Sequence, residues 1–510
     1  MFLESLIGVT LLAALIVFLS PDRYAGRLAF VLSLVPLGLS LELFRRFDGE
    51  GNAFLPTGSP AFENQFEWIA LEPYSISWWV GVDGISMPLV ILATILTSLA
   101  IVSAWTPIDE RQSQFYGLLL FLEASLIGVF VSLDFFVWFI FWEGVLIPMY
   151  LLIGVWGGPR RKYAAIKFFI YTNLASLILF IGFVSLVFGL GDAVDSFGLP
   201  EITGAIWAGE VQGFGALGAE TLTLVAFIAM FIGFAVKVPI VPVHTWLPDA
   251  HVEAPTPVSV ILAGVLLKMG TYALLRFNFT MLESVAHTLA PVIALLAVIS
   301  ILYGALLALA QSDLKRIVAY SSIASMGYVI LGLVAFTTYG MGGATFQMVS
   351  HGLISGLMFM VVGVIYNQTH TRMISDMAGL ADRMPIAAGV LVTGGFAYMG
   401  LPLMSGFVGE FTIFVGAFES VVIPWAPLLT AIAMLGIVLV AGYLLWAMQR
   451  TLFGPFRLES DAELSRSPVQ DILPMFVLLG LIILLGVHPE LVFGMIEEAV
   501  LPALEAGGDL

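Results

Sequence analysis

Apolar segments long enough to cross a lipid bilayer recur along almost the whole chain, and they constrain the fold more than any other feature. A bilayer core of about 30 Å requires about 20 apolar residues in an α-helix. Hydrophobic residues make up 60% of the sequence and charged residues only 11%, whereas a soluble domain typically has about 25% charged residues. We therefore predict an all-α polytopic membrane protein.

These segments predict about fourteen transmembrane helices of the usual length. Their approximate cores are residues 2–20, 26–44, 83–105, 115–132, 135–155, 164–189, 221–243, 256–277, 288–310, 316–338, 343–367, 385–408, 424–449 and 472–495. The first is expected to be a retained span, because it lacks the cationic leading region of a signal peptide. The polar stretch 48–80 has alternating aromatic residues and predicts a surface hairpin.

The positions of the cations predict the topology. Cytoplasmic loops of membrane proteins collect Lys and Arg, and an N-terminus on the outer side satisfies this rule. The outer side then keeps only Arg45, Arg46 and Arg276. The net charge of -17 argues against a nucleic-acid partner. The excess of acids fits either adaptation to high salt or ordinary solvated loop ends.

Four ionisable residues lie inside predicted spans: Glu143, Lys237, Lys268 and Glu410. Each costs about 2.5–3.5 kcal/mol at the centre of a bilayer and commonly marks an ion pathway. Static ion pairs that fix helix packing are the alternative. Four such residues of mixed sign on four different spans favour the pathway.

Lys237 is followed at once by Pro239 and Pro242. A proline has no N–H, so the carbonyls of Ala235 and Val238 lose their helical donors. Irregular backbone at membrane depth survives only inside protein or beside a wet cavity. The segment therefore predicts a hydrated break in the helix, with a simple proline kink as the alternative.

A second break is predicted before Glu410, in the stretch GLPLMSGFVGE. Paired interrupted helices in corresponding halves point to the transport site of an inverted-repeat carrier. We predict a first repeat over 115–280 with helices 4–8 and a second, inverted repeat over 288–450 with helices 9–13. Residues 1–114 would hold helices 1–3 and the hairpin, and residues 451–510 a loop and helix 14.

Proton transfer is the chemistry that these buried residues suggest. A lysine in an apolar interior gives up its proton more readily than one in water, and a nearby carboxylate such as Glu143 opposes this. Breaking a buried ion pair costs about 3–5 kcal/mol, and moving one charge against 200 mV costs about 4.6 kcal/mol. A switching Glu143–Lys237 pair could therefore drive a proton uphill, whereas a static pair could not.

Other polar residues offer weaker signals. His351 could pass protons between Lys268 and Glu410, or it could simply be satisfied by a neighbouring helix. Glu123 is a further acid inside a span and would serve a secondary path or packing. His244 and His251 flank Asp249, but Pro248 makes a metal site on one continuous helix improbable.

Three stretches carry a resemblance to a known family. They are FWEGVLIPMYLLIGVWGGPRRKYAAIKFFIYT, FAVKVPIVPVHTWLPDAHVEAPTPVSVILAGVLLKMGTYALLRF and GLPLMSGFVGEF. They resemble the subunit M family of respiratory complex I, the antiporter-like, proton-pumping chains of NADH–quinone oxidoreductase that are called subunit 4 in mitochondria. The resemblance covers nearly the whole chain, and the acid in GFVGEF distinguishes this family from its sister chains.

The resemblance implies fourteen helices, two inverted repeats and a role for each buried residue. Glu143 and Lys237 would form the pair on helices five and seven, and Lys268 would be the central lysine of helix eight. His351 would be a relay on helix eleven and Glu410 the terminal acid on helix twelve.

One departure from the family concerns helix ten. Ser325 stands where the family usually has a histidine, so this relay would depend more on water or hydroxyls.

The resemblance also implies a multi-subunit assembly in the energy-conserving membrane. By this resemblance, flavin, iron–sulfur clusters and quinone would belong to partner subunits. For the clusters the residues agree, because this chain has no cysteine to hold one. The expected partners are other membrane subunits, including sister antiporter-like chains, with NADH or another electron donor. A subunit of a Mrp-type sodium/proton antiporter or of a membrane-bound hydrogenase, and a non-pumping scaffold, are the rival interpretations.

Overall fold

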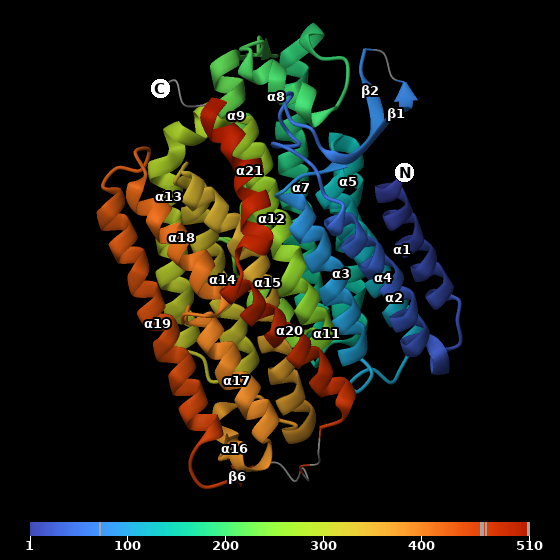
Figure 1. Cartoon of the computed structure of the whole chain (residues 1–510), viewed down its shortest axis with the longest axis vertical. Coiled ribbons are helices and arrows are strands. Elements are labelled where there is room, and N and C mark those ends of the chain that lie inside the picture. The colour runs from blue at the N-terminus through green and yellow to red at the C-terminus, as the bar shows by residue number, and fades with distance from the viewer. Residues whose placement is uncertain (71–72, 460–463, 465–466, 507–510) are drawn as a thin grey trace.

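The computed structural model describes residues 1–510 except 71–72, 460–463, 465–466 and 507–510. Most of the helices run roughly along the long axis of the molecule, and their loops gather at its two ends (Figure 1). Strands β1 (Ala61–Ala70) and β2 (Ser75–Val82) lie at one end, which we call the hairpin end. Strand β6 (Arg457–Leu458) lies at the other, the β6 end.

Twelve helical segments in the described residues are long and apolar enough to cross a membrane. They are α2 (Asp22–Arg45), α3 (Ser86–Ser103), α4 (Gln112–Val131), α5–α6 (Phe135–Trp156), α7–η1 (Arg161–Ala193), α9 (Ala219–Lys237), α11–η3 (Thr256–Met281), α13 (Glu283–Leu309), α14 (Leu314–Val334), α15 (Thr338–Thr369), α19 (Ala426–Leu452) and α20 (Val469–Val487). Two shorter apolar helices are α1 (Phe2–Phe18) and α17 (Pro385–Tyr398). The prediction of an all-α polytopic membrane protein is confirmed.

The remaining elements are short or lie at the ends of the bundle. They are α8 (Leu199–Trp207), α10 (Trp246–Glu253), α16 (Leu380–Arg383), α18 (Ser405–Glu419), α21 (Glu490–Ala506), η4 (Ile374–Asp376), β3 (Gly213–Phe214), β4 (Leu217–Gly218) and β5 (Met377–Ala378). The predicted surface hairpin is confirmed, because β1 and β2 pair antiparallel. The glycine-rich stretch GFGALG forms the small β3–β4 hairpin, which is not the strand–helix turn of a dinucleotide site.

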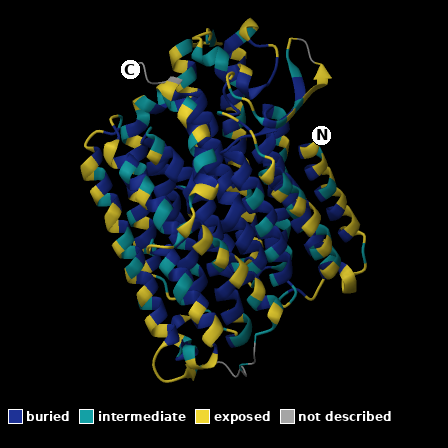
Figure 2. Cartoon of the chain, viewed as in Figure 1, coloured by how far each residue is buried: buried dark blue, intermediate teal, exposed yellow. Residues whose placement is uncertain are grey.

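The core of the bundle is formed by α14, α15 and the segment α11–η3, whose most apolar windows are almost entirely buried. The outer helices α2, α19 and α20 are buried over about a third of their windows or less, and Figure 2 shows exposed residues along their outward faces. Leu435 and Val438 on α19 are typical, with more than half of their surface exposed. Such an apolar perimeter suits lipid rather than water.

Several predicted spans are interrupted helices. The break after Lys237 is present, since α9 ends there and α10 begins only at Trp246. The predicted break before Glu410 is also present, since α17 ends at Tyr398 and α18 begins at Ser405. The core 472–495 is also divided, at the residue before Pro489, where a proline disfavours helical backbone. The breaks after Lys237 and Tyr398 therefore place the ends of α9 and α17 beside the candidate site.

Candidate functional site within the helix bundle

Lys237 is the last residue of α9, and only 2% of its surface is exposed. The carboxyl end of a helix carries partial negative charge, which favours a cation there. As predicted, Pro239 offers no helical donor to the Ala235 carbonyl, and that carbonyl instead accepts a hydrogen bond from the Ile240 amide at 2.9 Å. The Val236 carbonyl accepts one from Trp246 Nε1 at 2.8 Å. The break is thus a well-bonded turn.

The side chain of Lys237 lies against the Trp142 ring, which belongs to an aromatic cluster. Its Nζ lies 4.8 Å from the centre of the Trp142 ring, a cation–π distance. Trp142 is fixed in turn, because its indole Nε1 donates to Ser176 Oγ at 2.9 Å. The Trp142 ring also stacks on Trp138 at 4.9 Å and meets Phe234 edge-on.

Glu143 lies near enough to Lys237 for electrostatic interaction. The two make no ion pair within 4 Å in the part of the chain that the structure describes, and Glu143 Oε1 is buried without a hydrogen-bond partner there. The helix is interrupted just beyond, where α5 ends at Gly144 and α6 begins at Leu146, because Pro148 has no N–H to offer the Gly144 carbonyl. The structure therefore contains the two members of the predicted pair in an open arrangement.

Glu123 lies on α4 and is fully buried. Neither carboxylate oxygen has a hydrogen-bond partner among the described residues. A buried acid without a partner is costly as an anion and is stable there when it carries its proton. The structure places Glu123 within the first half of the bundle but adds no contact that links it to Lys237.

Lys268 occupies α12 (Leu267–Ala273), a short α-helical stretch between two π-helical turns, η2 (Leu262–Leu266) and η3 (Leu274–Met281). π-Helical turns shift the backbone hydrogen-bond pattern and often occur at functional sites. The fully buried Nζ of Lys268 donates to the Ala263 carbonyl at 2.5 Å and contacts His351 Nδ1 at 2.6 Å. The structure thus joins two of the predicted residues directly.

The contact fixes the tautomer of His351. An ammonium group has three donors and no acceptor, so Nδ1 of a neutral imidazole must accept and the ring proton sits on Nε2. Nε2 lies 3.0 Å from the hydroxyl oxygen of Tyr398, which accepts this proton in a hydrogen bond. Tyr398 then has its own O–H to donate to Ser322 Oγ at 3.3 Å, and Ser322 donates to the Val318 carbonyl at 3.3 Å.

Glu410 lies on α18, beyond the second break, and is 5% exposed. A Cβ at Gly400 would stand 2.5 Å from Glu410 Oε2, and Gly400 has a φ of +64°. Glycine is therefore needed both for the turn and for the room of the carboxylate. Glu410 interacts electrostatically with Tyr398, but no direct contact joins it to His351 in the described residues.

Tyr398 is the residue that sequence reasoning missed. It is the last residue of α17 and is 4% exposed, and its hydroxyl links His351 to the hydroxyls of α14. The available signal was its position, two residues before the Gly400 turn.

The two further histidines form no metal site in the described residues, where groups of three or more potential ligands do not occur. His251 is fully buried and stacks on Phe359 at 4.4 Å between ring centres. Asp249 is engaged elsewhere, because its carboxylate pairs with Lys167 at 2.8 Å and with Arg316 at 3.7 Å.

Arg276 was expected in an outer loop, but the structure buries it completely within η3. The positions of Lys and Arg indicate on which side of the membrane a span ends, but they do not show whether a side chain near that end points into the protein. Its guanidinium donates to Asp83 Oδ1 at 2.6 Å and to Asn52 Oδ1 at 2.7 Å, and Asp83 Oδ2 accepts from the Ala53 amide at 2.8 Å. Burial opposes ionisation of Asp83, yet the guanidinium holds its pKa below the usual range.

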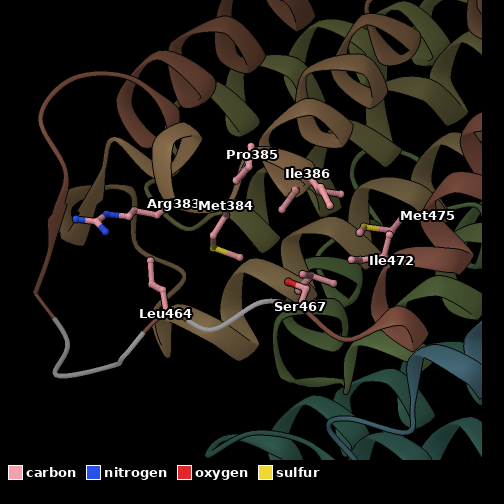
Figure 3. A pocket seen from close by; sticks show the side chains of 10 residues that line it. Arg383, Met384, Pro385, Ile386, Leu464, Ser467, Ile472 and Met475 are labelled. Carbon is pink, nitrogen blue, oxygen red and sulfur yellow. The ribbon is translucent and has the colours of Figure 1, made fainter.

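Two cavities of about 430 Å³ lie at the β6 end. One is polar and is lined by Glu253, Lys315, His370 and Arg372, among others. The other is mainly apolar and lies where Met384 and Ile386, at the start of α17, approach Ile472 and Met475 of α20 (Figure 3). None of the predicted site residues lines either of these two cavities.

Comparison with known proteins gives consistent matches. Residues 132–439 match the family model described as NADH:quinone oxidoreductase/Mrp antiporter, TM. NADH-quinone oxidoreductase subunit M of Rhodobacter capsulatus is 42% identical over 94% of this chain and 90% of its own length. F(420)H(2) dehydrogenase subunit M of Methanosarcina mazei is 38% identical over 98% of both chains.

Solved structures show the same fold. A chain of respiratory complex I from Thermus thermophilus with bound NADH superposes with a TM-score of 0.84, at 25% identity and over 100% of both chains. A chain of the Mrp complex from Dietzia sp. superposes with a TM-score of 0.82, at 23% identity, over 98% of this chain and 52% of its own.

Proposed function

Because the chain belongs to the NADH:quinone oxidoreductase/Mrp antiporter family, we propose that it is the proton-translocating membrane subunit of a redox-driven, quinone-reducing complex. The single observation that carries this proposal is the buried row from Lys268 through His351 to Tyr398, with its closely spaced hydrogen bonds. A row of groups that can each gain and lose a proton, inside an apolar bundle, is suited to moving protons.

In this proposal the first broken helix, α9, supplies protons to the row that begins at Lys268. Glu143 and Lys237 are poised apart, and a small movement of α5 or α9 would close the pair. Closing stabilises the charged lysine, and opening favours release of its proton. Lys268, His351 and Glu410 then receive and pass on the proton, and Glu123 serves a side path. The two repeats, 115–280 and 288–450, would move the proton in two halves of one route.

The redox chemistry would lie outside this chain. The names of the relatives include both an NADH-quinone oxidoreductase and an F(420)H(2) dehydrogenase, so the electron donor of the assembly is NADH or another reduced carrier. Flavin, iron–sulfur clusters and quinone would be bound by partner subunits. Sister antiporter-like chains and other membrane subunits are the neighbours that we propose.

We also propose that the N-terminus faces the outer side of an energy-conserving membrane. The β6 end carries Arg372 beside Lys315, and Arg160, Arg161 and Lys162 stand nearby at the start of α7. An excess of cations marks the cytoplasmic side, which would place the hairpin end outside.

The test uses membrane vesicles that contain the complete complex. Lys268→Ala should strongly lower proton uptake while the complex still assembles and reduces quinone, because it removes the central member of the row. Lys162→Ala, at an exposed position, is the matched control and should leave uptake unchanged. Wild-type uptake in the assembled Lys268→Ala complex would contradict the proposal.

A subunit of a Mrp-type antiporter is the second candidate, and the Dietzia superposition favours it on fold alone. Purification through a tag on this chain separates the two. Recovery of an assembly without redox subunits, with sodium/proton exchange and no quinone reduction, would select the antiporter.

A further inference from the structure

The hydroxyl of Tyr398 stands at a junction of three helices. It accepts from His351 Nε2 of α15 at 3.0 Å and reaches Ser322 Oγ of α14 at 3.3 Å. Ser321 and Ser325 of α14 also interact with it. The ring itself belongs to α17 and ends that helix at the second break. A single O–H group thus connects the buried imidazole to the interrupted helix.

We propose that Tyr398 is a proton-relay residue that passes protons between His351 and the Glu410 side of the second break. The inference rests on the proposed function and extends it to a residue and a step. Neither His351 nor Tyr398 contacts Glu410 directly in the described residues. Tyr398 stands two residues before Gly400, however, and the Glu410 carboxylate lies against that glycine, since a Cβ there would stand 2.5 Å from Oε2. The tyrosine is therefore the member of the row that lies at the turn beside the terminal acid.

The step conserves protons at every atom. His351 Nδ1 takes a proton from Lys268 Nζ while Nε2 releases its own, so one N–H bond forms and one breaks on the ring. The phenolic oxygen of Tyr398 gains that proton as its original O–H bond breaks. A water molecule between the phenol and Glu410 accepts the released proton and gives one of its own to the carboxylate, so the last O–H bond forms on Glu410. The hydroxyl is neutral before and after the step, so no charge is left on the ring.

Ser322 has a positioning role in this scheme. Its own O–H donates to the Val318 carbonyl at 3.3 Å, so its oxygen is free to accept from Tyr398. At rest this holds the Tyr398 O–H away from His351 and leaves a phenolic lone pair aimed at the imidazole. The O–H then turns from Ser322 toward the Glu410 side when it releases its proton.

Position 325 offers a way to separate relay from packing. The sequence has Ser325 where the resemblance implies a histidine, and this serine interacts with the Tyr398 hydroxyl. An imidazole at 325 would therefore bring a second titratable group to the place that the phenol now serves. A histidine there would compensate for a lost relay, but it would not compensate for a lost packing contact.

The experiment measures proton uptake in everted vesicles with a pH-sensitive dye, energised with the electron donor that the wild-type complex oxidises. The reference is the Lys237-dependent uptake, defined as wild-type uptake minus that of Lys237→Ala. We expect Tyr398→Phe to keep less than about a tenth of this part, since a positioned acid–base group contributes at least that factor. The double variant Tyr398→Phe/Ser325→His should regain most of it.

Tyr116→Phe is the matched control. Tyr116 lies on α4 in the first half of the chain, is 1% exposed and packs edge-on against Phe115. It should keep wild-type uptake. Uptake is expressed per assembled complex, judged from quinone reduction, so that a variant with poorer assembly still gives a value.

The outcomes distinguish the inference from the proposed function. Wild-type uptake in Tyr398→Phe, or a double variant no better than Tyr398→Phe, overturns the inference alone if Lys237→Ala has lost uptake. Wild-type uptake in Lys237→Ala overturns the proposed function itself.

Discussion

The two broken helices hold their ionisable residues in opposite ways. Around the first break, Lys237 lies against the Trp142 ring, and its acid partner Glu143 makes no ion pair with it in the described residues. Around the second, hydroxyl and imidazole groups already form a continuous row through His351 and Tyr398. The first region has charge without a connecting chain, and the second has a connecting chain with the Glu410 carboxylate near its end.

The difference suggests a division of work. An aromatic ring stabilises a cation without supplying an atom that can accept its proton, so proton transfer at Lys237 requires side chains to move. A hydrogen-bonded row transfers protons with small movements. We infer that the first break is the switch and the second the conduit.

The largest expected effect tests the switch at Lys237. Lys237→Ala should abolish this chain's share of uptake, and Lys237→Arg should do the same, because a guanidinium keeps its proton at any physiological pH. Proton uptake in vesicles is the measurement, with quinone reduction as the control for assembly. A Lys237→Arg complex that still pumps would show that Lys237 supplies only charge, and the first break would then not act as the switch.

The next effect concerns Glu143. Glu143→Gln removes the charge that must alternate, and we expect uptake to fall about tenfold or more, as for a lost acid–base group. Glu143→Asp keeps the carboxylate on a shorter arm and should retain a larger share. The two variants are compared at equal amounts of assembled complex; an equal loss in both would mean that geometry rather than charge is limiting.

At the second break, Gly400→Ala should have a moderate effect. The added Cβ would collide with Glu410 Oε2 and force a side chain into a positive-φ turn, which costs about 1–3 kcal/mol. We expect a lower unfolding temperature in detergent and a severalfold loss of uptake. Gly389→Ala is the matched control, since a Cβ there meets no atom within 4 Å. Similar losses in both variants would refute the crowding argument.

The smallest expected effect is that of Trp142→Phe. The smaller ring keeps an aromatic face for Lys237 but loses the hydrogen bond to Ser176, and a cation–π contact is worth about 0.5–2 kcal/mol. Uptake should fall about two- to threefold, and the exposed Trp425→Phe should change nothing. An effect as large as that of Lys237→Ala would make the indole itself part of the route.

Composition and apolar periodicity were sufficient to predict the bundle, the hairpin and both breaks. The breaks were visible because prolines and glycines stand beside a charge, as at Lys237 and Glu410. The division at Val487 was not foreseen, since one proline in an apolar run is compatible with a kinked but continuous helix.

The contacts of the site could not be predicted in the same way. Tyr398 looks like any aromatic residue near the end of a span, and only the folded structure shows its hydroxyl against His351. Arg276 was placed outside because charge statistics describe loops and not the direction of a side chain. Whether Glu143 and Lys237 touch depends on helix movement of a few ångströms, about which a sequence is silent.

The buried guanidinium of Arg276 has a consequence for how much of the chain is needed. Arg276 belongs to the stretch that matches the family, 132–439, but its carboxylate and amide acceptors, Asp83 and Asn52, come from the N-terminal hundred residues outside it. A fragment limited to the matched stretch would leave a permanent cation buried without its acceptors, which costs several kcal/mol. The segment between α2 and α3 therefore completes the charge balance of a stretch that follows it in the chain, and we expect a fragment without that segment to be less stable.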